Sequence, residues 1–307
     1  MKATRDALGD HLPTMGHKHK DIVALDADLG KATKLAKFGS EHPDRFFQIG
    51  IAEANMIGIS SGLSEYGYKV FLASFASFLT GRYDIIRCSL AYPRRPVIMV
   101  GTHVGMAIGK DGVTQMGLED VSIMRSLPNV KVLNPASYTE ATKVIEYLCE
   151  NELDSTYYLR LGRQPVKDYD IPFDINSGQI IKQGKDVTIM STGCILGDVM
   201  DAAELIEKEC SKTVRVVHFC SLKPVDKDLI IECAKETEHL YTVEDHSIVG
   251  GLGTIVSEVL SENYPKKLNR IGLNDVFPES APPIELYEKY GLSSGKISKR
   301  IIDDVDQ

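Results

Sequence analysis

The stretch Pro96-Val97-Ile98-Met99-Val100 decides the fold, because it is apolar at every position and ends at Gly101-Thr102-His103. A strand that is apolar on both faces belongs to a parallel sheet covered by helices on both sides. Further apolar runs of this kind occupy 22–25, 46–49, 69–73, 130–133, 157–160, 187–190, 214–217, 239–243 and 268–273. Helical patterns separate them at 53–65, 82–91, 119–126, 138–150, 196–208, 226–237 and 254–263. This alternation predicts an α/β fold with mostly parallel sheets flanked by helices.

The alternation pauses at residues 164–184, where proline, glycine and aspartate gather. Such residues suit a connection between domains. We therefore predict a first domain at residues 1–165, a linker at 166–186 and a second domain at 187–307. In open α/β sheets, ligands bind at the carboxyl ends of the strands, so candidate site residues are sought there.

Composition excludes several classes of protein. The 307 residues are 43% hydrophobic and 25% charged, with a formal net charge of −8. An acidic chain makes a poor nucleic-acid binder, and no apolar stretch approaches the length of a membrane span. The N-terminus lacks the apolar region of a signal peptide, and the six cysteines are scattered, without zinc spacing. We expect a cytoplasmic protein with reduced thiols, no nucleic-acid partner and no membrane contact.

Several candidate residues follow predicted strands. Glu53 begins a helix directly after a strand, where an acidic residue also serves helix electrostatics. Phe75 and Phe78 share a face if their segment is helical, which suits core packing or a flat ligand. His103 directly follows the apolar strand and is either a ligand-contacting or a structural histidine.

A glycine-rich loop spans residues 105–117, and its four glycines permit close approach of a ligand. It matches neither a P-loop nor the dinucleotide fingerprint, so we set aside ATP and NAD. Arg163 lies at the domain junction and Arg5 near the N-terminus. Arginines bind phosphate when they converge on one pocket, which the sequence alone leaves open.

Taken together, these segments resemble the C-terminal half of transketolase, a thiamine diphosphate enzyme, over essentially the whole chain. The resemblance rests on the order and spacing of matching stretches in both domains. These stretches lie at 41–46, 51–56, 74–78, 109–116, 125–129, 242–246 and 250–253. The version Asp111-Gly112-Val113-Thr114-Gln115-Met116 is similar to animal-type transketolases.

The resemblance implies a thiamine diphosphate site. Glu53 matches the glutamate that hydrogen-bonds the aminopyrimidine ring and so promotes removal of the thiazolium proton. Phe75 and Phe78 match aromatics that pack on the aminopyrimidine. Asp28 and Leu29 match residues on the thiazolium side.

The resemblance also implies a sugar phosphate site. His103 and Gln115 match polar groups that face the donor ketose, and Gln115 is also expected to contact the cofactor. Asp111 matches a carboxylate that binds a substrate hydroxyl, while Arg5 and Arg163 match guanidiniums that hold the phosphate. The expected catalytic residues are Glu53, His103 and Gln115.

Two positions depart from the family pattern. Ala32 stands where a serine usually helps to bind phosphate, although Thr33 is adjacent. Gly81 stands where an arginine or tyrosine often borders the cofactor, although Arg82 follows. Both departures concern the identity of the substrate more than the cofactor site.

The family's metal motif, Gly-Asp-Gly followed by asparagine, has no candidate in this chain, and we expect no metal ligand here. The resemblance therefore implies an N-terminal partner subunit that holds the diphosphate and Mg²⁺ or Ca²⁺. Thiamine diphosphate would be shared between the subunits of an α2β2 assembly, with self-association of this chain at its core. The expected reaction is ketol transfer between sugar phosphates, as in the pentose phosphate pathway.

Two other interpretations remain. The chain could be a subunit of a related enzyme, of the 1-deoxyxylulose 5-phosphate synthase type or the 2-oxoacid dehydrogenase beta type. It could also be a non-catalytic homologue that only assembles. Arg5, His103 and Arg163 favour phosphorylated sugars, and the retained Glu53 and Asp111 argue against loss of catalysis.

Overall fold

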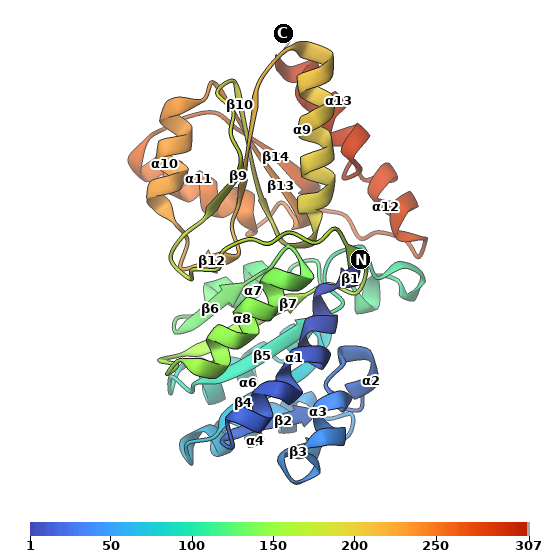
Figure 1. Cartoon of the computed structure of the whole chain (residues 1–307), viewed down its shortest axis with the longest axis vertical. Coiled ribbons are helices and arrows are strands. Elements are labelled where there is room, and N and C mark those ends of the chain that lie inside the picture. The colour runs from blue at the N-terminus through green and yellow to red at the C-terminus, as the bar shows by residue number, and fades with distance from the viewer. Residues whose placement is uncertain (306–307) are drawn as a thin grey trace.

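A seven-stranded sheet in the order β12-β6-β7-β5-β4-β2-β3 forms the centre of the N-terminal half (Figure 1). The computed structural model describes residues 1–305. Six strands are parallel: β2 (Ile22–Asp26), β3 (Phe46–Gln48), β4 (Lys69–Phe75), β5 (Val97–Thr102), β6 (Val130–Leu133) and β7 (Thr156–Leu161). Strand β5 lies inside the sheet, between β7 and β4, as its apolar sequence predicts.

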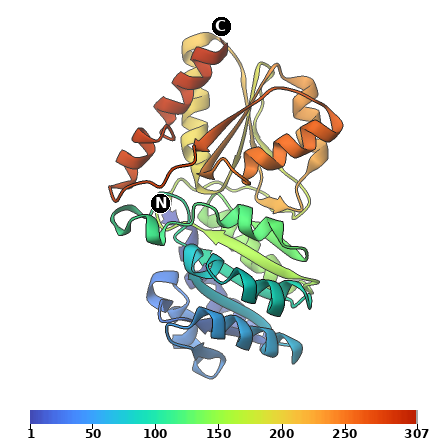
Figure 2. The ribbon, with the colours of Figure 1, turned by 180° about the vertical axis from the view of Figure 1, so that it is seen from behind.

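Helices cover both faces of this sheet. One face carries α1 (Thr4–Lys18), α3 (Ala36–Glu41) and α8 (Tyr138–Glu150), which are in front in Figure 1. Figure 2 shows the opposite face, with α4 (Glu53–Glu65), α6 (Tyr83–Ile86), the π-helix η2 (Arg87–Ala91) and α7 (Asp120–Ser126). The doubly covered parallel sheet confirms the fold class predicted for this half.

The C-terminal half has a five-stranded sheet in the order β14-β13-β10-β11-β9. Its strands are β9 (Gln179–Lys182), β10 (Val187–Thr192), β11 (Val214–His218), β13 (His239–Ser247) and β14 (Leu268–Leu273). All pairings are parallel except that of β9 with β11. Its helices are α9 (Leu196–Cys210), α10 (Lys227–Glu236), α11 (Leu252–Asn263), α12 (Pro283–Lys289) and α13 (Ser294–Val305). Figure 1 shows α9 and α13 on one side of the sheet and α10 and α11 on the other.

Several elements differ from the sequence prediction. Helix α1 was not predicted, since its apolar pattern is weak and it contains Pro13. Strand β9 forms within the stretch predicted as linker, because it pairs with β11 of the second sheet. Strand β12 (Ser221–Lys223) comes from the C-terminal half but extends the first sheet, antiparallel to β6. Such short strands depend on distant partners and leave little signal in the local sequence.

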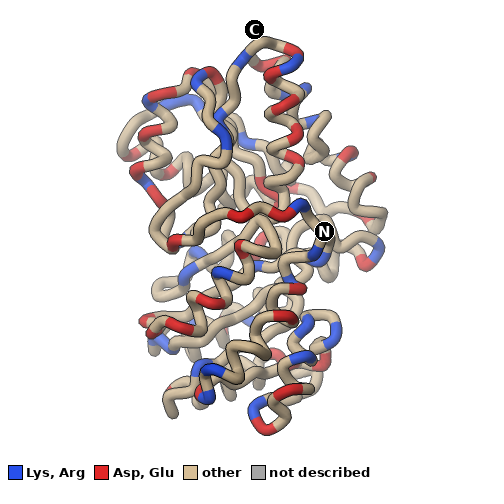
Figure 3. Tube along the Cα trace, viewed as in Figure 1, with Lys and Arg blue, Asp and Glu red and all other residues tan. Residues whose placement is uncertain are grey.

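The two halves also share interior packing. One apolar core cluster contains residues of both, among them Val132 of β6 and Leu222 of β12. Figure 3 shows Lys and Arg scattered among Asp and Glu over both halves. Among residues 1–305, no helix is long and apolar enough to cross a bilayer.

Candidate functional site

The carboxyl ends of the parallel strands in the first sheet bring most predicted site residues to one edge. Asp28 and Leu29 follow β2, Glu53 follows β3, and His103 follows β5. Phe75 ends β4, and Arg163 comes two residues after β7. Because these strands are parallel and adjacent, their carboxyl ends form a continuous rim, which is where this class of sheet binds ligands.

Glu53 is a buried carboxyl group at the first position of α4, with 5% of its surface exposed. Within residues 1–305, its side chain accepts one hydrogen bond, from the Ser74 hydroxyl at 3.3 Å. A buried carboxylate ordinarily takes several hydrogen bonds, so this one retains capacity for a donor. A ring nitrogen that carries a proton would meet that need.

Three rings stack in two pairs around Phe75, at the end of β4. The Phe75 and Phe78 rings are 5.3 Å apart with an interplanar angle of 19°. The Phe75 and His103 rings are 3.7 Å apart at 29°. The Ser77 hydroxyl, between the two phenylalanines in sequence, is buried with no hydrogen-bond partner in the described chain. Stacked rings with an unpaired hydroxyl nearby suit a flat, polar heterocycle.

His103 is a neutral histidine held in one tautomer. Burial, followed by the charges of Arg5 and Arg163, lowers its pKa to about 3. Its Nε2 is 3.0 Å from Arg5 Nη1 and must accept that hydrogen bond, since a guanidinium only donates. Its Nδ1 is 2.9 Å from the Thr102 hydroxyl, which itself donates to the Ser74 carbonyl oxygen at 3.2 Å. The Nδ1–H of His103 therefore donates to Thr102.

Two arginines converge on this histidine, which the sequence alone left open. Arg163 lowers the pKa of Arg5 as well as that of His103, with burial as the larger cause for both groups. Arg5 donates to the Ala32 carbonyl oxygen at 2.7 Å, and Arg163 forms an ion pair with Asp111. Two guanidiniums beside an uncharged imidazole form a site that would be stabilised by an anion.

The side of the rim next to β2 holds a cavity. A cavity of about 450 Å³ is lined by Asp28 and Leu29 together with Asp26 and Gln48. Gln48 accepts the backbone N–H of Asp28 at 2.9 Å and donates to Asp26 at 2.5 Å. Asp28 has a φ of 65°, so this contact fixes an unusual backbone shape. Asp26 and Gln48 were not predicted as site residues, although they end β2 and β3.

Three positions singled out in the sequence make few contacts with the rest of the site: Gln115, Gly81 with Arg82, and Ala32 with Thr33. Gln115 ends the short helix η4 (Val113–Gln115), and its side chain makes no hydrogen bond within residues 1–305. Gly81 and Arg82 are exposed next to the end of α5 (Ala76–Thr80). The Thr33 hydroxyl donates back to the Leu29 carbonyl oxygen at 3.2 Å, within its own turn. The Thr33 hydroxyl therefore does not substitute for the serine hydroxyl that the family pattern has at the position of Ala32.

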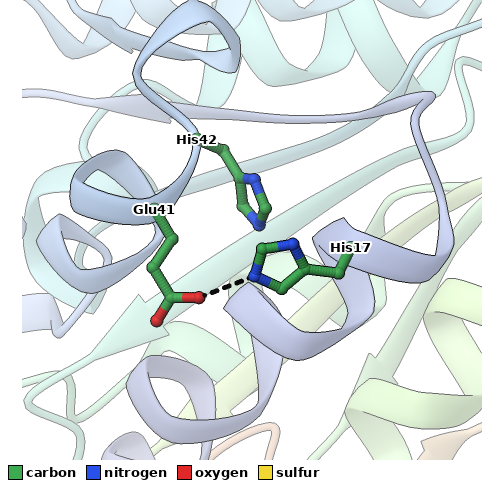
Figure 4. A group of neighbouring side chains, drawn as sticks. All are labelled: His17, Glu41 and His42. Atoms are coloured by element: carbon green, nitrogen blue, oxygen red, sulfur yellow. Dashed lines mark hydrogen bonds and ion pairs between the residues drawn. The ribbon is translucent and has the colours of Figure 1, made fainter.

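Two groups of potential metal ligands lie elsewhere in the described residues. In Figure 4, His17 points at Glu41, at 3.0 Å, with His42 beside them. His42 already uses both ring nitrogens, on the Pro13 carbonyl oxygen at 2.8 Å and on Arg45 at 2.9 Å. This group therefore fastens α1 to the end of α3 and has too few free ligands for a metal.

The second group is Glu140, His218 and Cys220, all buried between the two halves. His218 Nε2 is 3.0 Å from the Glu140 carboxylate, a direct hydrogen bond that leaves no space for an ion between them. Burial raises the pKa of the Cys220 thiol, so it stays protonated and a weak ligand. The group joins the domains rather than binding a metal.

Comparison with known proteins agrees with this geometry. The family model "Transketolase, pyrimidine binding domain" matches residues 1–168, and "Transketolase, C-terminal domain" matches residues 176–297. The chain belongs to the transketolase family, whose members depend on thiamine diphosphate. The resemblance stated from the sequence is thereby confirmed.

Some relatives match this chain over nearly their whole length, and others match it over about half of a longer chain. A candidate transketolase C-terminal section of Methanocaldococcus jannaschii is 39% identical, over 99% of this chain and 96% of that protein. A solved split-gene transketolase, described as an inactive β4 tetramer, superposes with a TM-score of 0.89 and 40% identity, covering 97% of each chain. Human transketolase is 33% identical over 97% of this chain, which spans 48% of the human protein.

Proposed function

We propose that this chain is the C-terminal subunit of a split transketolase, which moves a two-carbon ketol group from a ketose phosphate to an aldose phosphate. One observation carries the proposal. A buried carboxyl group with spare acceptor capacity, Glu53, occupies the same rim as two arginines that converge on a neutral histidine. The first feature suits a cofactor ring and the second suits a sugar phosphate.

The residues fit the aminopyrimidine end of thiamine diphosphate. Glu53 would accept a hydrogen bond from a ring nitrogen, in a site from which water is largely excluded. Phe75 and Phe78 would stack along the ring. Asp28 and Leu29 would border the neighbouring cavity. Thiamine diphosphate, when bound, supplies the carbon that carries the two-carbon unit and accepts the electrons of the broken carbon–carbon bond.

The substrate-facing residues have distinct tasks. Arg5 and Arg163 would bind the phosphate, and Arg5 would then release His103 Nε2 to face the sugar. Asp111, which now pairs with Arg163, would accept a hydrogen bond from a sugar hydroxyl. Gln115 has a free amide, which would bind the same sugar and the cofactor. Ala32 contributes its carbonyl oxygen to the position of Arg5.

We propose that the diphosphate and its Mg²⁺ or Ca²⁺ are held by an N-terminal partner subunit. The absence of a metal motif from the sequence and the 48% coverage of human transketolase support this division. We propose that this chain alone forms an inactive assembly and that it forms an α2β2 complex with the partner subunit. The inactive β4 tetramer described for the similar split-gene protein supports this proposal. The domain bounds of 1–165 and 187–307 stay predictions. So does the location of the complex in the cytoplasm.

We propose that the face of the first sheet covered by α4 and η2 is a surface for association. The large apolar side chains Ile51 and Tyr66 flank α4 with 83% and 86% of their surface exposed, and Tyr92 after η2 has 85% exposed. Exposed apolar groups on one face commonly mark an interface. Because Glu53 begins α4, a subunit that covers this face would also close the cofactor site.

Reconstitution tests the proposal. The chain is mixed with a partner subunit that carries the Gly-Asp-Gly motif, thiamine diphosphate and Mg²⁺, and ketol transfer from xylulose 5-phosphate to ribose 5-phosphate is measured. Activity is expected only from the mixture. Glu53→Gln should lower kcat by roughly 100-fold to 10,000-fold, the range typical for an acid–base group. Glu209→Gln, at an exposed position of α9 in the second domain, is the matched control and should retain activity.

A substrate panel separates the alternatives. Pyruvate as the preferred donor would contradict ketol transfer and favour a related thiamine diphosphate enzyme. Failure to bind the cofactor, with the partner present and assembled, would favour a non-catalytic homologue. Xylulose 5-phosphate should be preferred to xylulose, and Arg163→Gln should reduce that preference by roughly tenfold or more, since one charged phosphate contact is lost.

A further inference from the structure

Every predicted site residue lies in the first 163 residues, so the second domain contributes none of them. The loop of residues 104–117 is where that domain meets the site. It carries Asp111 and Gln115, and it closes on itself through a hydrogen bond from the Gly105 N–H to the Gly117 carbonyl oxygen at 2.8 Å. Contacts of the second domain with the site are therefore to be sought at this loop.

Asp245, in β13 of the second domain, bonds directly to this loop. Its Oδ1 accepts the Met106 N–H at 2.9 Å, and its Oδ2 accepts the Tyr287 hydroxyl at 2.7 Å. Arg160 of β7 donates through Nη2 to the main-chain oxygens of both Asp245, at 2.9 Å, and Gly117, at 3.0 Å. Both ends of the loop are thus linked to one buried acidic residue.

Three glycines let the second domain approach the loop closely. Gly105 has a φ of +69°, and a Cβ there would collide with the Asp245 carboxylate. A Cβ on Gly112 would collide with Ser280, and one on Gly109 would lie 3.3 Å from Pro283. The second domain therefore packs on the loop along much of its length, with Asp245 at the tightest contact.

Asp245 is a costly residue to bury. It is 6% exposed, and its burial raises the pKa of its carboxyl group. A buried carboxyl group is tolerated when donors satisfy its oxygens. Here the Met106 N–H and the Tyr287 hydroxyl supply those donors. Both bonds serve to join the loop, β13 and α12, the helix that carries Tyr287.

We propose that Asp245 and Tyr287 are positioning residues, which hold the 104–117 loop in the shape that presents Asp111 and Gln115 to the donor sugar. The second domain then acts on the reaction through this bonded pair. The inference rests on the proposed function for its catalytic consequence, while the hold on the loop is a property of the chain itself.

Hydrogen exchange of the whole chain tests the hold on the loop. Tyr287→Phe removes one hydroxyl and keeps the ring, and Asp245→Ala removes both bonds. We expect exchange in residues 105–117 to rise roughly threefold to tenfold in Tyr287→Phe and further in Asp245→Ala, as loss of one or two hydrogen bonds implies. Tyr241→Phe is the matched control, because its hydroxyl faces Asp304 at 3.5 Å, in the same domain.

Kinetics of the reconstituted enzyme test the catalytic consequence. Asp245→Ala should lower kcat/KM for the donor ketose by roughly 10-fold to 100-fold, because small displacements of positioning groups are expensive. The affinity for thiamine diphosphate should fall much less, because Glu53, Phe75 and Phe78 lie outside the loop, whereas a general loss of folding would lower both quantities alike. Asp226→Asn, at a carboxylate that caps α10 by accepting the Leu229 N–H at 3.0 Å, is the second control and should leave both quantities unchanged.

Unchanged loop exchange in both Asp245→Ala and Tyr287→Phe would overturn the proposal. So would a loss of cofactor affinity equal to the loss of kcat/KM, since that result describes unfolding rather than positioning. If the wild-type mixture transfers no ketol group, the proposed function fails, and the exchange experiment alone decides whether the second domain holds the loop.

Discussion

Arg5 and His103 show how a histidine between two arginines is kept ready for an anion. The imidazole is neutral because burial and two positive charges oppose its protonation. Its Nε2 is occupied by Arg5, which an incoming phosphate would draw away. The pair therefore links binding of the anion to the freedom of the imidazole.

This linkage predicts a shift in the pKa of His103. Binding of inorganic phosphate between Arg5 and Arg163 should raise that pKa from about 3, because a negative charge favours the imidazolium. Nuclear magnetic resonance of labelled histidine, recorded against pH with and without phosphate, measures it. Arg163→Gln should raise the pKa without phosphate and weaken its response to phosphate. Arg87→Gln, at an exposed arginine of η2, should do neither.

Individual site residues were predictable where a motif met a strand end. Glu53, Phe75 and His103 follow apolar strands, so their positions at the rim followed from fold and sequence together. Convergence of the two arginines was not predictable, because Arg5 reaches the rim through α1, an element whose pattern is weak. Asp26 and Gln48 were missed because nothing in the sequence connects them before β2 and β3 pair.

At the scale of elements, a buried acid of β13 binds the first N–H groups of α11 and has an unusual titration. Glu244 of β13 accepts the backbone N–H groups of Leu252, at 2.7 Å, and Gly253, at 2.9 Å. Burial nevertheless raises its pKa from 4.5 to about 7. The folded protein thus binds this proton more tightly than the unfolded chain does.

Stability should therefore depend on pH through Glu244. An acid whose pKa is higher in the folded state stabilises the fold below the unfolded value, near pH 4.5, and that contribution is lost as the pH rises through about 7. Glu244→Gln removes this titration, so its Tm relative to wild type should be more favourable at pH 8 than at pH 5. Thermal unfolding of both proteins across this range measures the difference. An equal Tm difference at both pH values would contradict the assignment.

Arg45, at the end of η1 (Pro43–Arg45), joins that helix to α1 and β2. Its guanidinium donates to the carbonyl oxygens of Gly16 at 2.7 Å, His19 at 2.9 Å and Ile22 at 3.2 Å. Arg45→Met should lower the free energy of unfolding by about 2–4 kcal/mol, because several charge-assisted bonds are lost. Urea unfolding checks this value, with the exposed Lys20→Met as control. A loss similar to that of the control would show that water replaces these bonds at little cost.

Elements of regular pattern were predicted well, and elements defined by a distant partner were not. The apolar runs that became β5, β10 and β14 and the helix at 53–65 lie where predicted. Strands β1 (Lys2–Ala3) and β8 (Pro165–Val166) have two residues each and exist only as a pair. Their residues could have followed many other local paths.

At the scale of the whole molecule, a buried bond between His218 and Glu140 joins the two domains. Neither side chain is exposed, and each comes from a different domain. His218→Ala leaves the Glu140 carboxylate with one fewer donor and should destabilise the protein by about 2–4 kcal/mol. Calorimetry should show the domains unfolding less cooperatively, as a broadened or divided transition. His239→Ala, at a histidine nearer the surface, should keep a single transition.

The pairing of β12 with β6 has a consequence for synthesis on the ribosome. Strand β6 is the edge strand of the first sheet until β12 pairs with it. Strand β12 begins about 60 residues after β7 ends, and translating that stretch at ~5–20 residues per second takes roughly 3–12 s. During that interval the nascent first sheet carries an unprotected strand edge, a common template for wrong pairing. Delayed closure makes the newborn chain a candidate for chaperone assistance until Ser221–Lys223 emerge.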